Sequence, residues 1–392
     1  MKEASQRGGS GKIAFADGLR GIASLLVLIA HYVLVFQYIR GEYDGLPALY
    51  ADPYPHKLVR FLSISPYINL GALGVALFFL ISGLVVPQAI ANLPSNLRGM
   101  MAFVAGRIFR IWPTYVAGFA VTMLALFCGA AYKSHYLTYS WYTIWWHMSL
   151  FRDWTEYPSI DGVVWTLEVE TKFYLFVLLF WSAIRRGKVY PFFVIAAAAA
   201  WAAPYKAAYP MGWNPPENFL WPLKYLLFMT VGVAFNFHYR KLMSARKFAI
   251  SVAVLMGVFL WCCHREDFTA DVYLSYVAAL AIFAALYFWF PEWEGGFLVR
   301  FFARISYPMY VCHAAMGYVG IRILIDLGAP PLCALVTQTL LTLLVSWNIH
   351  VVYERPFHHA GRWVSRIIAG KKPVSASGNT NRANDALGAS RT

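Results

Sequence analysis

The chain alternates long apolar segments with polar loops, and the length of the apolar segments predicts its architecture. Ten of these segments are roughly long enough to cross about 30 Å of hydrocarbon as a helix. We therefore predict an all-α fold, a polytopic integral membrane bundle of about ten transmembrane helices. The fifth and seventh are the shortest of the predicted spans, which cover residues 20–39, 68–91, 111–131, 163–183, 189–203, 219–238, 248–263, 271–290, 307–325 and 331–353.

Basic residues gather in every second loop, and this alternation predicts how the bundle is oriented. The positive-inside rule places the basic loops, and with them both termini, in the cytoplasm. An even number of spans requires the same arrangement. The N-terminal stretch is polar and carries no cleavage pattern, so we expect the first span to act as an uncleaved signal-anchor. The basic side holds Lys2, Arg7, Lys12, Arg98, Arg107, Arg185, Arg186, Lys188, Arg240, Lys241, Arg246, Lys247, Arg300 and Arg304.

Composition supports the membrane assignment and excludes two other classes of protein. The chain is 59% hydrophobic and 13% charged, with a mean hydropathy of +0.52, whereas soluble domains carry about 25% charged residues. We therefore expect membrane lipids as partners. The net charge of +14 follows the loops instead of one patch, so no nucleic-acid partner is expected. The five cysteines lack CxxC spacing and imply no disulfide framework.

One membrane domain is predicted over residues 16–367. It lies between a cytoplasmic N-terminal segment, 1–15, and a cytoplasmic tail, 368–392, whose Ser/Asn/Ala-rich composition predicts disorder. Two outer loops are long, 40–67 and 132–162. The second contains WYTIWWHMSLF, an aromatic run too short to span, which indicates an interfacial or re-entrant helix.

The first span carries an arginine and a histidine on one predicted face. Arg20 and His31 are eleven residues apart, close to three helical turns, which separates them by roughly 16 Å along the axis. Ionisable groups at membrane depth are costly, so they usually face a cavity and have a function. The alternative is a histidine whose hydrogen bonds are satisfied by a neighbouring helix.

Two arginines in RIFRIWP precede the third span. Arg107 and Arg110 are three residues apart and share a helix face. Their guanidinium groups suit the bidentate binding of phosphate or pyrophosphate. The alternative is ordinary positive-inside flanking of a membrane helix.

The segment WTLEVETKFYL opens the fourth span from the outer side. Glu168 and Lys172 have the spacing of a helical ion pair, whereas Glu170 lies roughly 200° around the helix from Glu168. We therefore expect one carboxylate to be structural and the other to be free for polar work within the bundle. A packing network of both carboxylates is the alternative.

Two further motifs lie near the end of the chain. In ARISYPMYVCHAAM the polar residues recur at helical spacing, and His313 lies roughly 13 Å inside the membrane from Arg304. His313 either mirrors His31 or is a buried structural histidine. In YERPF, Pro356 is expected to stop the last helix and Arg355 to complement its dipole, so this motif is interpreted as a structural terminus. The chain shows no GxGxxG, Walker or HExxH motif in a suitable context and no metal-ligand cluster.

Together these segments resemble the membrane acyltransferase-3 family, whose members acylate bacterial surface glycans, Nod factors and antibiotics. The family fold is a helical bundle of about ten spans. The resemblance covers nearly the whole chain and rests on six pieces in the family's order: DGLRGIASLLVLIAHY, GALGVALFFLISGLVV, RIFRIWP, WTLEVETKFYL, RISYPMYVCH and ERPF.

The resemblance implies a bacterial inner-membrane enzyme that transfers an acyl group, usually acetyl from acetyl-CoA, to a carbohydrate or lipid-linked glycan hydroxyl. It implies that His31, Arg20 and Glu170 are catalytic, and that Arg107 and Arg110 bind the acyl-CoA phosphates. Acyl-CoA is then a co-substrate, and no permanently bound cofactor is expected. The residues expected to bind substrate are Trp165, Glu168, Tyr307 and His313.

This chemistry is physically reasonable, because a neutral imidazole can remove the proton of a hydroxyl as it attacks a thioester. Arg20 or a tyrosine is a candidate donor to the developing oxyanion. Direct transfer and a route through a transient acyl-histidine both remain open. The rival function is a transporter or flippase of lipid-linked sugars, in which the same polar residues form a path. The absence of an internal repeat argues against it, and a receptor has little support because no sizeable extramembrane domain is present.

Overall fold

The computed structural model describes residues 13–36, 54–63, 67–134, 136–208 and 215–371, so most of the predicted N-terminal segment, of the first outer loop and of the predicted tail lies outside the described residues. Within these ranges nearly all residues are helical and no β-strand occurs. Eight helices are long and apolar enough to cross a membrane, which confirms the predicted polytopic helical membrane bundle. They cover Ala14–Val35, Leu70–Ala91, Leu97–Tyr132, Asn218–Tyr239, Ala245–Arg265, Ala270–Trp289, Phe297–Asp326 and Pro331–Ile368.

Ten labelled elements make up most of the eight long helices, and the shorter set given after them includes α16, which completes the last of the eight. The long set comprises α1 (Ala14–Ile29) continued by η1 (Ala30–Val35), α4 (Leu70–Ala91), α5 (Leu97–Tyr132), α11 (Leu223–Tyr239), α12 (Ala245–Arg265), α13 (Ala270–Trp289), α14 (Phe297–Asp326), α15 (Pro331–Ile349) and η3 (His350–Glu354). The shorter set comprises α3 (His56–Ser63), α6 (Trp141–Ser149), η2 (Arg152–Trp154), α7 (Val164–Leu179), α8 (Trp181–Arg185), α9 (Tyr190–Ala208), α10 (Pro215–Leu220) and α16 (Arg355–Ile368).

Several predicted spans differ from the observed helices; the ninth, for example, begins at Phe297 instead of residue 307. The predicted fourth span is divided at Phe180 into α7 and α8, and the fifth corresponds to α9, whose apolar part Tyr190–Pro204 is short. The third span is a 36-residue helix, α5, which begins at Leu97 instead of residue 111. Asn96 accepts a hydrogen bond from the N–H of Gly99 and so caps this early start. Arg107 and Arg110 therefore lie inside α5.

The interpretation of YERPF as a helix terminus is wrong. The chain continues from α15 through the π-helical turn η3 into α16, and Pro356 lies in the first turn of α16. Proline is tolerated there because a π turn shifts the hydrogen-bond register and a first-turn residue needs no intrahelical N–H bond. Because the helix continues, Glu354 and Arg355 are part of it and do not lie in a terminal loop.

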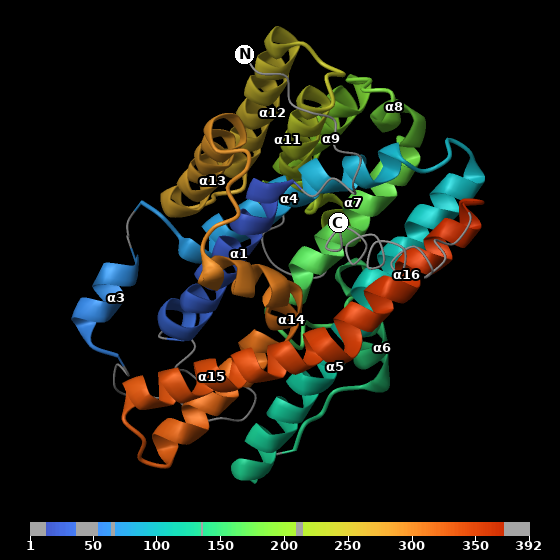
Figure 1. The fold of residues 1–392 in the computed structure, drawn as a ribbon. Coiled ribbons are helices and arrows are strands. Elements are labelled where there is room, and N and C mark those ends of the chain that lie inside the picture. The colour runs from blue at the N-terminus through green and yellow to red at the C-terminus, as the bar shows by residue number, and fades with distance from the viewer. Residues whose placement is uncertain (1–12, 37–53, 64–66, 135, 209–214, 372–392) are drawn as a thin grey trace, which may run out of the picture.

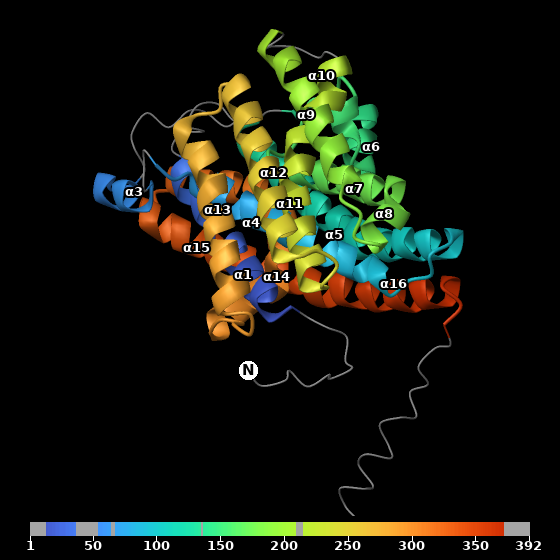
Figure 2. The same cartoon turned by 90° about the horizontal axis from the view of Figure 1, so that it is seen from above.

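The helices form a layered arrangement around α4 and α14 (Figure 1). One group, α9, α11, α12 and α13, lies on one side, and α5, α15 and α16 lie on the other, with α1 between them. Figure 2 shows α16 running beside α5. Close packing depends on small residues: a Cβ on Gly83 of α4 or Gly232 of α11 would collide with the backbone of the other helix.

Candidate functional site

A cavity of about 610 Å³ lies among α1, α4, α5, α7, α14 and the turn from η3 into α16. Five arginines, four carboxylates and three histidines line it, which is a high charge density for a membrane bundle. Many of its charged groups come from the starts of α1 and α14 and from α16, at the end predicted to be cytoplasmic. The charged and histidine groups are Asp17, Arg20, Arg110, Glu170, Glu294, Arg300, Arg304, His350, Glu354, Arg355, His358 and His359.

Arg20 lines this cavity from the first turns of α1. Its guanidinium donates to the Asp17 carboxylate at 3.1 Å, one helical turn earlier. Arg20 also interacts electrostatically with Arg110, Glu170 and Glu354, which come from three other elements. Arg20, Arg110 and Glu170, which come from three separate sequence motifs, therefore line the same cavity.

Glu170 is the carboxylate of α7 that faces the cavity. It accepts hydrogen bonds from the hydroxyls of Tyr174, at 2.5 Å, and Ser82, at 3.3 Å. The guanidinium of Arg107 lies over the rings of Tyr174 and Phe103, 5.4 and 5.2 Å from their centroids. Arg107 thus supports the tyrosine that holds Glu170.

The two arginines of RIFRIWP have different positions, although both were predicted to bind the same phosphates. Arg110 lines the cavity, whereas Arg107 is not among the lining residues and lies against aromatic rings. Residues three apart on a helix are offset by roughly 60°, which is enough for only one of them to face a narrow cavity. The binding role remains a prediction for both residues.

Two tyrosines on successive turns of α14 line the cavity. Tyr307 donates to the Ile111 carbonyl at 2.8 Å and so links α14 to α5. Tyr310, one turn deeper, shares a 2.6 Å hydrogen bond with Thr166 and donates to the Val163 carbonyl at 3.3 Å. Tyr310 and Thr166 both line the cavity, whereas the next histidine along α14 does not. We take this hydroxyl pair as the inner end of the cavity.

His31 and His313 lie together just beyond this inner end. Their ring centroids are 4.7 Å apart with the planes nearly perpendicular, and the His313 ring is 5.8 Å from that of Tyr310. His31 belongs to the π-helical segment η1, a rare geometry that is frequent at functional sites. Arg20 and His31 were predicted to share one helix face, but only Arg20 lines the cavity. His31 contacts His313 instead.

The hydrogen bonds of His31 fix its tautomer. Its Nδ1 lies 2.8 Å from the Val27 carbonyl, which can only accept, so Nδ1 carries the proton. In the neutral ring Nε2 is then an acceptor with a lone pair. His31 is partly exposed, whereas the side chain of His313 is buried.

The segment that sequence reasoning treated as a terminus contributes several cavity residues. His350 and Glu354 form a 2.6 Å contact within the π turn η3, and both line the cavity with Arg355 and His358. The polar spacing HxxxE in an apolar helix was a usable signal for this pair. The interpretation of Pro356 as a helix stop concealed it.

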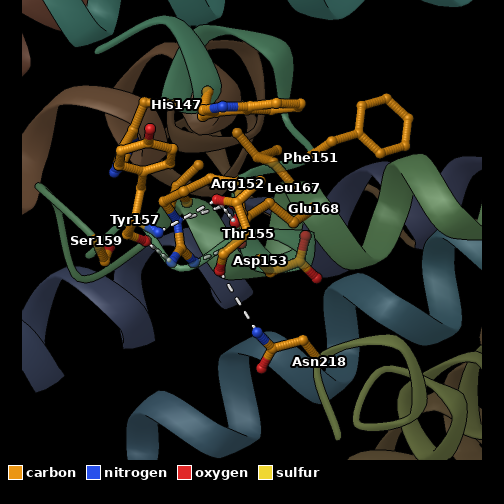
Figure 3. Close-up of polar contacts among 12 residues, drawn as sticks. His147, Phe151, Arg152, Asp153, Thr155, Tyr157, Ser159, Leu167, Glu168 and Asn218 are labelled. Atoms are coloured by element: carbon orange, nitrogen blue, oxygen red, sulfur yellow. Dashed lines mark hydrogen bonds and ion pairs between the residues drawn. The ribbon is translucent and has the colours of Figure 1, made fainter. Parts of the chain in front are cut away.

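Glu168 and Lys172 do not pair as predicted. Both oxygens of the Glu168 carboxylate accept from Arg152, at 3.0 and 2.8 Å (Figure 3). Lys172 donates to Asp153 at 2.6 Å. Arg152 and Asp153 are neighbours in η2, so two ion pairs fasten the outer loop to α7. Each side chain thus pairs with a residue of η2 instead of with the other. Within Glu168, Lys172 contacts the backbone carbonyl and not the carboxylate.

Trp165 and Glu168, both predicted to bind substrate, lie away from the cavity lining. Trp165 belongs to an aromatic cluster with Phe79, Trp221 and Tyr225, the nearest ring being 5.2 Å away. Glu168 is 0% exposed and is held by Arg152. Of the four predicted substrate-binding residues, only Tyr307 lines the cavity, and His313 lies beyond its inner end.

Besides the two ion pairs, a group of hydrogen bonds around His147 holds the outer loop in place. His147 of α6 accepts from the N–H of Ile160 at 2.7 Å and contacts the Tyr115 hydroxyl at 3.3 Å. Burial, with a further contribution from the Arg152 cation, lowers the pKa of His147 to about 3, so the ring is neutral and can accept. Burial raises the pKa of Asp161 to about 6, although it accepts from two backbone N–H groups at the start of α7.

Comparison with known proteins identifies the family. The model of a family described as "Acyltransferase domain" (Acyl_transf_3) matches residues 13–351. The chain belongs to the acyltransferase-3 family. This match confirms the resemblance inferred from the six sequence motifs, and it covers every helix that forms the cavity apart from most of η3 and all of α16.

One curated relative in this family comparison is the Nodulation protein 10 of Rhizobium leguminosarum bv. viciae. It is 32% identical over 141 residues, which cover 32% of this chain and 37% of the relative. The matched region therefore spans less than half of that protein. No solved protein structure matches the chain.

Proposed function

We propose that this acyltransferase-3 member moves an acyl group, acetyl by family expectation, from acyl-CoA to a hydroxyl of a carbohydrate or lipid-linked glycan. We place it in a bacterial inner membrane, with the arginine-rich end of the cavity in the cytoplasm. One observation carries the proposal. His31, whose neutral ring has a lone pair on Nε2, contacts His313, and His313 lies next to Tyr310 at the inner end of a charged cavity. A base beside a channel for an anionic donor suits acyl transfer.

The donor is expected to enter through the arginine-rich end of the cavity, the end predicted to be cytoplasmic. Acyl-CoA carries several phosphate charges, and arginine binds phosphate oxygens well. Asp17 partly neutralises Arg20, and a backbone carbonyl holds one N–H of Arg300. Arg110, Arg304 and Arg355 have no ion pair with another described residue. These three arginines are therefore the best candidates to hold the nucleotide phosphates.

The reaction is then a direct attack on the thioester. His31 Nε2 takes the proton of the acceptor hydroxyl, and the hydroxyl oxygen bonds to the thioester carbon. The carbon–sulfur bond breaks, and the CoA thiolate leaves and is protonated. Positioned general bases of this kind contribute about 10²–10⁴-fold to the rate. For the thioester to reach His31, the side chain of Tyr310 must swing away from Thr166.

The test is release of free thiol from acetyl-CoA by the purified full-length protein in detergent, with and without candidate glycan acceptors. Release that requires an acceptor, together with an acetylated product, would support acyl transfer. Folded protein that releases no thiol with any acceptor would overturn the proposal. A transporter or flippase would behave in this way, because transport needs two compartments and detergent removes them.

The cavity geometry predicts that Arg110 and Arg107 differ in kinetic effect. Arg110→Gln should raise KM for acetyl-CoA by about 10-fold or more, since it removes a charge-assisted phosphate contact. With acetyl-pantetheine, which lacks the nucleotide phosphates, the same variant should match the wild type. Arg98→Gln is the matched control, because Arg98 is exposed on the same helix and does not line the cavity.

Arg107→Gln should act on kcat for both donors, because Arg107 supports the tyrosine that holds Glu170. Equal KM increases in the Arg107 and Arg110 variants, restricted to acetyl-CoA, would contradict the geometric distinction and restore both arginines as phosphate ligands.

A further inference from the structure

The two histidines beyond the cavity have matching hydrogen bonds. His31 Nδ1 donates to the carbonyl of Val27, and His313 Nδ1 lies 2.9 Å and 3.1 Å from the carbonyls of Tyr310 and Met309. Carbonyl oxygens only accept, so both Nδ1 atoms carry protons. Both Nε2 atoms are therefore acceptors with lone pairs.

His313 Nε2 is buried without a hydrogen-bond partner, and the whole side chain is 1% exposed. An unsatisfied buried acceptor is costly and rare in folded proteins. The neighbouring His31 ring, 4.7 Å away between centroids and nearly perpendicular, does not satisfy it, since neither nitrogen of that ring makes a hydrogen bond with His313 Nε2 in this structure. The structure therefore holds a buried acceptor beside His31, which the N–H of a protonated His31 ring reaches once that ring turns toward His313.

We propose that His313 is a positioning residue for acyl transfer and that its Nε2 shares the proton that His31 takes from the acceptor hydroxyl. This inference rests on the proposed function. The acceptor O–H bond breaks, the proton moves to His31 Nε2, and it is shared with His313 Nε2. The oxygen bonds to the thioester carbon, the carbon–sulfur bond breaks, and the thiolate later receives that proton. The buried acceptor is satisfied only after proton transfer begins, so the contact favours the transition state over the ground state.

The surroundings hold His313 in place without competing for its Nε2. The Tyr32 hydroxyl donates to the backbone carbonyl of His313 at 3.0 Å and does not reach its ring nitrogen. The titratable groups that face the pair from the described part of the chain are Tyr32, Tyr310 and Tyr318, with rings 5.8–6.3 Å from one of the histidines. Tyrosine is neutral between pH 5 and 9, so its titration does not interfere with that of the pair.

The experiment compares His313→Leu, which has no acceptor, with His313→Gln, which keeps one. The leucine variant should lose about 10-fold or more in kcat with KM for acetyl-CoA unchanged. Sharing stabilises protonated His31, so its loss should also move the acidic limb of the pH profile of kcat/KM to lower pH. The glutamine variant should recover part of kcat and return the limb toward its wild-type position.

A purely structural histidine predicts another result. Wild-type kcat and an unmoved acidic limb in folded His313→Leu would overturn the inference, as would equal losses in the two variants. If His313→Leu does not fold, His313→Phe, which keeps a ring but has no acceptor, takes its place: the same loss of kcat and shift of the acidic limb support the inference, and wild-type values of both refute it. Wild-type protein without acceptor-dependent thiol release would instead refute the proposed function. His264→Leu, an exposed histidine of α12, is the control.

Discussion

Replacing His31 by glutamine is expected to lower acceptor-dependent acyl transfer by about 10²–10⁴-fold, the usual contribution of a positioned general base. Glutamine can keep a hydrogen bond to the Val27 carbonyl, but it has no basic nitrogen to replace Nε2. Binding of acetyl-CoA should be unaffected, since His31 does not line the cavity. Thiol release in the presence of acceptor measures the first effect, and equilibrium binding of acetyl-CoA measures the second.

His264→Gln is the matched control for this change, because His264 is exposed at the end of α12 and far along the chain from the cavity helices. Turnover of the His31 variant within about a factor of ten of wild type would remove His31 as the base. Loss of donor binding in folded His31→Gln would indicate that the histidine holds the donor. Either result would direct attention to Glu170 or the His350–Glu354 pair, which do line the cavity.

The second large effect concerns stability, and it comes from the ion pair between Arg152 and Glu168 (Figure 3). Arg152→Met should destabilise the protein by about 3–5 kcal/mol, because it leaves a fully buried carboxylate without its cation. The outer loop should loosen first, since Arg152 also donates to the Tyr157 carbonyl. Thermal unfolding in detergent and hydrogen exchange of residues 150–163 measure the two consequences.

A double variant separates pairing from burial. Arg152→Met combined with Glu168→Leu should recover much of the lost stability, because replacing both members of a buried pair by apolar residues is often neutral. Arg186→Met, an exposed arginine after α8, is the control for loss of a positive charge. A single variant as stable as wild type would contradict the geometry of the pair, as would a double variant no better than the single one.

Local pattern was a reliable guide to the helices and less reliable at their ends. Apolar length predicted the bundle, because backbone groups in hydrocarbon must be satisfied within each segment. It failed at the early start of α5, which a capping side chain sets, and where a π turn accommodates Pro356. Hydropathy does not report either situation, because neither depends on contact with lipid.

The site motifs show the same division. Spacing placed Glu168 and Glu170 on different faces, and the structure gives them different surroundings, one in an ion pair and one in the cavity. Spacing also predicted a Glu168–Lys172 pair, but both side chains bind neighbouring residues of η2 instead. Intrahelical pairs contribute only about 0.2–0.5 kcal/mol, so a buried partner from another segment easily replaces them.

The sequence by itself determined that this is a helical membrane protein, and its ordered motifs indicated the acyltransferase-3 family. It also named Arg20, His31, Arg110 and Glu170 as residues to examine. Only the tertiary structure decided that three of them share a cavity while His31 faces His313 beyond its end. The physical reason is that hydrophobicity and spacing act within one helix, whereas a cavity depends on how α1, α4, α5, α7 and α14 pack together.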